Sequence, residues 1–157
     1  MRIFFVILIS FSGYCQQKYL PATIFISPII LIENVRLTSQ FGFRMHPVTK
    51  STSFHNAIDI AAPSHTEVYA SSSGIVKKIG FDVNLGIYIV IAHQNKIESL
   101  YGHLFAVCVE AGQEVVIGEH LGFVGKTGRA TGFHLHFGIK QENQWKNPID
   151  FLLGNRL

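Results

Sequence analysis

TGFHLHFGIK, residues 131–140, has the two-residue alternation that is typical of a β-strand. Successive side chains of a strand point to opposite faces, so His134 and His136 share one face. Leu135 and Phe137 then share the other face, which suits a hydrophobic core. Two histidines on the first face would fit a plain solvated surface or a functional site, and the rest of the chain decides between these interpretations.

The same alternation recurs along most of the chain, and no ten-residue segment keeps the 3.6-residue period of a helix. HQNK, residues 93–96, has the length and polarity of a hairpin turn. NPIDFLL, residues 147–153, predicts one short helical turn that begins at Pro148. We predict strands over residues 73–81, 86–94, 96–104, 114–118, 121–126 and 133–141. The fold class is therefore mainly β, an antiparallel sheet or sandwich with little helix.

Length and composition bound the function further. The chain has 157 residues, of which 48% are hydrophobic and 15% charged, so one domain with a real core is expected. The net charge is +3, but the basic residues are scattered singly and form no stripe, which argues against nucleic-acid binding. A modest positive charge suits contact with an anionic polymer such as a cell wall.

The N-terminus, MRIFFVILISFSGYC over residues 1–15, is typical of a secretory signal peptide. Arg2 supplies the positive charge, and the apolar run of about ten residues that follows is too short to span a bilayer. Cleavage after Cys15 is favoured over lipid attachment at Cys15, where the preceding Tyr14 is bulky, and over an uncleaved anchor. We therefore expect an exported protein, periplasmic or extracellular at the cell wall, with no membrane span in its mature form.

Residues 16–36 form a poorly patterned N-terminal segment, whose apolar part is broken by Pro28. Packing along one edge of the domain is favoured over a role as an inhibitor that blocks a groove. Cys108 lies among apolar neighbours and is expected in the core. Without Cys15 it has no partner for an internal disulfide.

Histidine and aspartate recur in three spaced clusters. The first is His55-x-x-x-Asp59, the second contains His103 in YGHL, and the third is His134-x-His136. Both residue types are ordinary zinc ligands, and a catalytic zinc site takes three protein ligands and leaves one position open. Three ligands and two further histidines are the number that a metal-dependent hydrolase needs.

Geometry restricts how the first cluster could bind one ion. In a straight strand the Cα atoms of His55 and Asp59 would be about 13 Å apart. A helix would bring them to roughly 6 Å, but the residues after Asp59 look extended. We therefore expect a bend at the small Ala57. In the third cluster the two Cα atoms are about 6.6 Å apart, so one ring could bind the metal while the other stands beside it.

Three stretches together resemble a known family. TSQFGFRMHPVTKSTSFHNAIDIAAPSHTEVYA from residue 38, YGHL from residue 101 and GKTGRATGFHLHFGI from residue 125 are similar, in order and spacing, to the M23 (LytM/lysostaphin-like) zinc peptidases. The resemblance covers roughly residues 38–140. It implies a peptidase domain over residues 37–157, with an antiparallel β fold and a groove across the sheet.

The resemblance also implies roles for the clustered residues. His55, Asp59 and His136 would bind one Zn²⁺, and His103 and His134 would be the catalytic pair, with no assignment of base and acid between them. The implied activity is that of a zinc metalloendopeptidase that hydrolyses peptide bonds in the stem-peptide cross-links or bridges of peptidoglycan, for wall remodelling or lysis. Which bond is cut stays open.

Three positions depart from the usual family pattern. Ala57 replaces the glycine of H-x-G-x-D and could narrow the choices of backbone at the bend. Phe133 stands where proline is common, and Gly138 replaces the acidic residue that often follows H-L-H-F. Because none of the three is an inferred ligand, we expect these departures to alter the rate or the specificity without abolishing activity.

Two alternatives belong to other functional classes. A non-catalytic LytM-like module would bind the wall or activate other wall enzymes, but such relatives usually lack zinc ligands. A biotinyl or lipoyl carrier would need an exposed lysine at a hairpin tip, and the glycine-flanked Lys126 lacks the expected neighbours. For the remaining histidines we expect plain surface or core roles, with His46 the best further candidate and Arg44 a substrate or structural contact beside it. Those histidines are His46, His65, His93 and His120.

Overall fold

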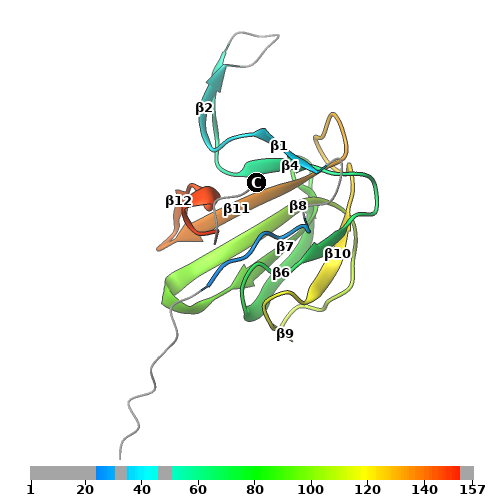
Figure 1. Cartoon of the computed structure of the whole chain (residues 1–157), viewed down its shortest axis with the longest axis vertical. Coiled ribbons are helices and arrows are strands. Elements are labelled where there is room, and N and C mark those ends of the chain that lie inside the picture. The colour runs from blue at the N-terminus through cyan, green and yellow to red at the C-terminus, as the bar shows by residue number, and fades with distance from the viewer. Residues whose placement is uncertain (1–23, 31–34, 46–50, 153–157) are drawn as a thin grey trace, which may run out of the picture.

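The computed structural model describes residues 24–30, 35–45 and 51–152, and the chain in these ranges is mostly β-strand (Figure 1). The strands are β1 (Arg36–Ser39), β2 (Gly42–Met45), β3 (Thr52–His55), β4 (Ile58–Ala61), β5 (Glu67–Tyr69), β6 (Gly74–Asp82), β7 (Gly86–Ala92), β8 (Ile97–Val107), β9 (Glu114–Val115), β10 (His120–Val124), β11 (His134–Gln141) and β12 (Gln144–Lys146). Two short 3₁₀ turns, η1 (Gln94–Lys96) and η2 (Pro148–Asp150), complete the described elements. Neither of these turns could span a membrane.

Ten of the described strands form one sheet, and the predicted mainly β class is confirmed. Its main path runs β1-β4-β11-β8-β7-β6-β9, while β10 joins β5 to β8 and β12 pairs with β11. Neighbouring strands along this path are antiparallel, as β4 and β11 are. The hairpin of β2 and β3 is a separate two-stranded sheet, and Figure 1 shows β2 extending away from the main sheet.

The alternation in β11 sorts its side chains as the sequence predicts. Leu135, Phe137 and Ile139 are fully buried in the core, while His134 and His136 lie on the opposite face. The core is closed by aliphatic side chains from the other central strands of the sheet. This burial fixes the register of β11, because a slip by one residue would turn its apolar side chains to solvent.

The N-terminal segment contributes to this core in the part that the structure describes. Phe25 and Ile29 are buried among the core residues. The Ile26 amide donates to the Ser71 carbonyl at 2.8 Å, and the Tyr69 amide donates to the Pro28 carbonyl at 2.8 Å. Residues 24–30 therefore pack on the domain, whereas the predicted signal peptide, residues 1–15, lies outside the described residues.

The sequence prediction for Cys108 is wrong, because its side chain is exposed. The residue lies just beyond the end of β8, where the two-residue alternation stops, and the neighbouring Val109 takes the buried position. The two predicted turns are present, since η1 connects β7 to β8 and η2 begins at Pro148.

Candidate metal centre

Three of the predicted site residues meet where β3, β4 and β11 come together. Asp59 of β4 and His136 of β11 are direct cross-strand partners. His55 ends β3, and the chain then bends at Ala57 before β4 begins. Ala57 is fully buried and makes this bend without entering the left-handed region, so alanine is accommodated at the position where glycine is usual.

The donor atoms of these three residues are close enough to share one ion. His136 Nδ1 lies 2.8 Å from Asp59 Oδ1, and His55 Nε2 lies 3.2 Å from the same oxygen. The two histidine nitrogens are 3.3 Å apart. Ligand atoms around a tetrahedral zinc ion with bonds of about 2.0–2.1 Å lie roughly 3.3 Å from one another. Two imidazole nitrogens and a carboxylate oxygen at these distances therefore fit a zinc ion.

Hydrogen bonds orient the first ligand. His55 Nδ1 lies 3.0 Å from the Gln40 carbonyl, and the tautomer that donates to this carbonyl is the one that leaves Nε2, which faces Asp59, free for a metal ion. The Ser39 hydroxyl lies 3.2 Å from the same Nδ1, and Arg44 donates to that hydroxyl at 2.6 Å. Such outer contacts fix the tautomer of a metal-binding histidine.

The Asp59 carboxylate is ionised in this environment. Burial would raise the pKa of Asp59, but hydrogen bonds from His136 and His55 hold it well below its usual range. Arg44 Nη1 lies 3.7 Å from Asp59 Oδ2, so Arg44 is a structural contact of the site. A metal ion would take the place of the protons in these hydrogen bonds, since ligand nitrogens and carboxylates bind a cation in their deprotonated form.

His103 and His134 lie side by side next to this group, with ring centroids 4.6 Å apart. His103 Nδ1 donates to the Thr127 carbonyl at 2.8 Å, and His134 Nδ1 donates to the Gly132 carbonyl at 2.9 Å. These bonds favour the tautomer with the proton on Nδ1 in both rings, and His134 Nε2 faces the site, 3.7 Å from Asp59 Oδ1. Burial lowers the pKa of His103, against the opposing effect of the bond to Thr127, which favours its neutral form.

The backbone of His103 is held in a strained conformation. Its φ is 60°, in the left-handed region that costs a non-glycine residue about 1–2 kcal/mol. The His103 amide donates to the Leu85 carbonyl at 2.7 Å, which adds a second anchor to the one on its ring. The strained backbone aims the ring across the sheet toward His134 and His136.

Thr127 supports this arrangement and was not found by the sequence analysis. Its hydroxyl donates to the Leu104 carbonyl at 2.7 Å and accepts from the Ile87 amide at 3.0 Å. These bonds attach the loop that carries the Thr127 carbonyl to two central strands. The loop packs tightly, since a side chain at Gly86 would lie only 2.2 Å from Thr127 Oγ1. The only signal in the sequence was the glycine-flanked GKTG stretch.

The other histidines lie outside this constellation. His65 is exposed and stacks on Phe105, and His120 donates through Nε2 to the Gly122 carbonyl at 2.9 Å. His93 is held between the Ser73 carbonyl and the Ser99 hydroxyl. The candidate His46 lies outside the described residues.

Comparison with known proteins identifies the family of the chain. The model of peptidase family M23 matches residues 53–148, which include the whole constellation. The chain belongs to peptidase family M23. The resemblance drawn from the sequence is therefore confirmed, and an M23 peptidase implies a metal, for which the His–Asp–His group is present.

The relatives of this M23 peptidase include bacterial wall enzymes. It is 42% identical, over 118 residues, to the DD-carboxypeptidase/endopeptidase Mpg of Neisseria meningitidis, an alignment that covers 75% of this chain and 27% of that protein. The chain thus spans about a quarter of the length of this relative.

Solved structures share the fold. A zinc-containing peptidase from Vibrio cholerae superposes with a TM-score of 0.70 and 32% identity, covering 80% of this chain and 39% of that one. The catalytic domain of lysostaphin from Staphylococcus simulans superposes with a TM-score of 0.67 and 26% identity, covering 75% and 92% of the two chains. The antiparallel architecture of the chain is thus that of M23 peptidases.

Proposed function

We propose that this M23 peptidase is a zinc-dependent endopeptidase that hydrolyses peptide bonds in peptidoglycan. The proposal depends on one observation: two histidines, each held through Nδ1 by a backbone carbonyl, lie beside a His–Asp–His group whose donor atoms are 2.8–3.3 Å apart. Acid–base groups adjacent to a metal group are what metal-assisted hydrolysis requires.

His55 Nε2, Asp59 Oδ1 and His136 Nδ1 are the proposed ligands. A bound zinc ion supplies Lewis acidity, which lowers the pKa of a coordinated water and polarises a carbonyl group. The carboxylate and the two imidazoles fix the ion at the point where β4 and β11 pair, on rigid strands.

His103 and His134 are the proposed catalytic pair. A neutral imidazole near pH 7 accepts a proton from the attacking water, and the resulting imidazolium returns it to the leaving amine. The carbonyls of Thr127 and Gly132 keep both rings in the tautomer that this step needs. The other ring of the pair donates a hydrogen bond to the developing oxyanion when it is protonated.

The relatives support a substrate and a location. A DD-carboxypeptidase/endopeptidase and a peptidoglycan DD-endopeptidase of Vibrio cholerae are 42% and 43% identical to parts of this chain, which supports peptidoglycan peptides as the substrate. A wall substrate and the apolar N-terminus of the sequence support export to the periplasm or the cell wall. The signal peptide over residues 1–15 and its cleavage after Cys15 are part of the same proposal.

The test is incubation of the zinc-loaded full chain with purified cross-linked peptidoglycan fragments, with the products identified by mass spectrometry. We expect loss of cross-linked species, inhibition by a zinc chelator, and loss of activity in His134→Ala. His120→Ala is the matched control, because His120 lies outside the site and should leave the rate unchanged. Zinc binding without any cleavage would instead support a wall-binding module.

A further inference from the structure

The face of the sheet that carries His136 continues into further cross-strand rows. His136 pairs with Gly102, and the next residue on the same face of β11, Gly138, pairs with Leu100. That row continues through Val90 to Lys78. Same-face residues along a strand are about 6.6 Å apart, so this row begins next to His136 at Gly138 and runs across three further strands to Lys78.

Gly138 is required by a side chain that lies over it. A Cβ atom built on Gly138 would be 2.9 Å from Cζ3 of Trp145, closer than real Cβ contacts. The Trp145 ring thus occupies the space above the position where the family often carries an acidic residue. Trp145 faces Lys140 across the β11–β12 pair, and the Lys140 ammonium lies 4.6 Å from the centre of its ring.

A recess of about 280 Å³ opens beside this ring, and we call it the Trp145 recess. Its apolar lining includes Leu85, whose side chain also reaches Gly102, the cross-strand partner of His136. Leu85 therefore contacts both the recess and the strand position opposite His136. The residues on which the argument depends are Lys78, Leu85, Tyr88, Leu100, Lys140 and Trp145.

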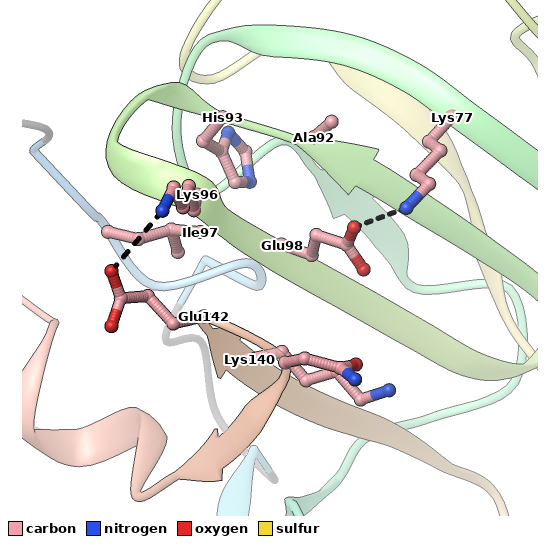
Figure 2. A pocket seen from close by; sticks show the side chains of 9 residues that line it. Lys77, Ala92, His93, Lys96, Ile97, Glu98, Lys140 and Glu142 are labelled. Carbon is pink, nitrogen blue, oxygen red and sulfur yellow. Dashed lines mark hydrogen bonds and ion pairs between the residues drawn. The ribbon is translucent and has the colours of Figure 1, made fainter.

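Two carboxylates also line the recess, but both have partners. Asp82 accepts hydrogen bonds from the amides of Asn84 and Leu85, at 2.8 and 3.1 Å. Glu98 lies 2.5 Å from the ammonium group of Lys77. Figure 2 draws this ion pair. The charge of Glu98 is thus paired within the domain, whereas Asp82 remains an ionised carboxylate held by backbone amides, because these bonds lower its pKa.

A β-bulge accounts for the pairing of Glu98. The register of β6 against β7 passes from Val76 opposite Ile91 to Lys78 opposite Val90, so Lys77 is the extra residue. A bulge turns an additional side chain toward one face, and here Lys77 pairs with Glu98 while Lys78 faces the recess.

Lys78 and Lys140 provide positive charge at the Trp145 recess. The Lys78 ammonium lies 5.4 Å from the centre of the Tyr88 ring, and Lys140 lies over Trp145. In Figure 2 the ion pairs are Lys77 with Glu98 and Lys96 with Glu142, and neither includes Lys140. An apolar recess with ammonium groups on two sides suits an aliphatic group that ends in a carboxylate.

We propose that the Trp145 recess binds a side chain of the substrate peptide that has an aliphatic stem and a terminal carboxylate. The stem packs on Trp145 and Leu100, and the carboxylate lies between Lys78 and Lys140. This inference rests on the proposed function for the identity of the substrate, because the recess lies on the same face of the sheet as the His–Asp–His group. Trp145 is then a specificity-determining residue.

Trp145 is the only tryptophan of the chain, so its fluorescence reports directly on the recess. The probe is an acetylated and amidated tripeptide, alanyl-aminoadipyl-alanine, whose side-chain carboxylate is its only charge, with the side-chain amide as its matched partner. Both are titrated into the full chain with and without zinc. We expect a saturable change in emission and a tighter Kd for the carboxylate, by about two- to fivefold for each lysine.

Variants distinguish binding in the Trp145 recess from binding elsewhere on the chain. Lys140→Gln should reduce the preference for the carboxylate, whereas Lys96→Gln, which removes an exposed lysine outside the recess, should not. Gly138→Ala should displace the Trp145 ring and weaken binding of both peptides, and calorimetry measures this without the fluorescent signal. A preference for the carboxylate that is unchanged in Lys140→Gln, or no binding to the wild-type chain, would overturn the proposal.

The zinc-free titration distinguishes this inference from the proposed function. Binding in the recess should persist without the metal, whereas a carboxylate held by zinc would be released, and that release would overturn the proposal. If recess binding is found but the zinc-loaded chain cleaves no peptidoglycan fragment, the proposed function fails and the recess stands. If cleavage occurs without any preference for the carboxylate, the recess proposal fails alone.

Discussion

Replacement of Thr127 by valine tests how the catalytic pair is held. Valine has nearly the shape of threonine but lacks the hydroxyl, which donates to the Leu104 carbonyl at 2.7 Å and accepts from the Ile87 amide at 3.0 Å. The change removes both bonds and leaves the backbone carbonyl that accepts from His103 chemically intact. Any effect on activity must therefore come from the position of that carbonyl.

The expected loss of stability follows from the two backbone groups. Each polar group deprived of its partner in a partly buried position costs about 1–3 kcal/mol. Because Thr127 is half-buried and water reaches part of the loop, we expect a decrease of about 2–3 kcal/mol in the free energy of unfolding. A displacement of His103 by about 1 Å would lower kcat/KM by up to about 100-fold.

Two assays measure these effects on the zinc-loaded full chain. Urea unfolding followed by circular dichroism gives the change in stability, and cleavage of a cross-linked peptidoglycan fragment gives kcat and KM. We expect kcat to fall by about ten- to a hundredfold, KM to change little, and zinc content to stay the same, since Thr127 contacts none of the three proposed ligands.

Thr127→Ser is the matched control, because it keeps the hydroxyl and loses only a methyl group. It should retain most of the stability and most of the activity. If Thr127→Val and Thr127→Ser behave alike in both assays, the hydroxyl does not hold the loop and the reasoning is refuted.

Three further predictions concern stability and metal binding. Burial lowers the pKa of His93, against the hydrogen bond to Ser73, so the unfolded chain binds more protons below pH about 6.5. The free energy of unfolding should therefore decrease as the pH falls from 7 through this range, and His93→Gln should lose this component in urea titrations; an unchanged pH dependence would contradict it. Tyr101→Phe should lower the free energy of unfolding by about 1–3 kcal/mol, because the Ser71 amide donates to its hydroxyl at 2.9 Å in the core; a neutral effect in the same titration would count against it. Asp59→Asn should weaken zinc binding by at least about 100-fold in competition with a chelator, since it removes the anionic ligand; near-normal affinity would exclude Asp59 as a ligand.

The strands were predictable from sequence because each has one face in the core. Leu135 and Phe137 alternate with the two histidines of β11, and the structure buries the former pair as the pattern indicates. Where a strand ends, the pattern no longer applies, which is why Cys108 is exposed although its neighbours are apolar. The order of the strands in the sheet could not be predicted from the sequence, because hydrophobic alternation does not indicate which strands are neighbours.

The residues of the site were predictable by type and spacing, but their supports were not. His55 and Asp59 are four residues apart, and only the bend at Ala57 brings their donor atoms to 3.2 Å. The Gln40 and Thr127 carbonyls that orient two of the rings are backbone groups, and a backbone group has no signature in the residue type.

The packing of Trp145 on Gly138 likewise could not be predicted from the sequence. Gly138 stood out in the sequence as a departure from the family pattern, but its cause became visible only in the register of β11 against β12. The departure and the tryptophan belong to one packing arrangement.

The measurement that tests the central claim most directly is a zinc titration of the metal-free full chain, with hydrolysis of a cross-linked peptidoglycan fragment as the readout. The account predicts that hydrolysis is absent without metal and rises with added zinc to a plateau at one equivalent per chain. Hydrolysis by the metal-free chain, or none at any zinc concentration, would contradict it.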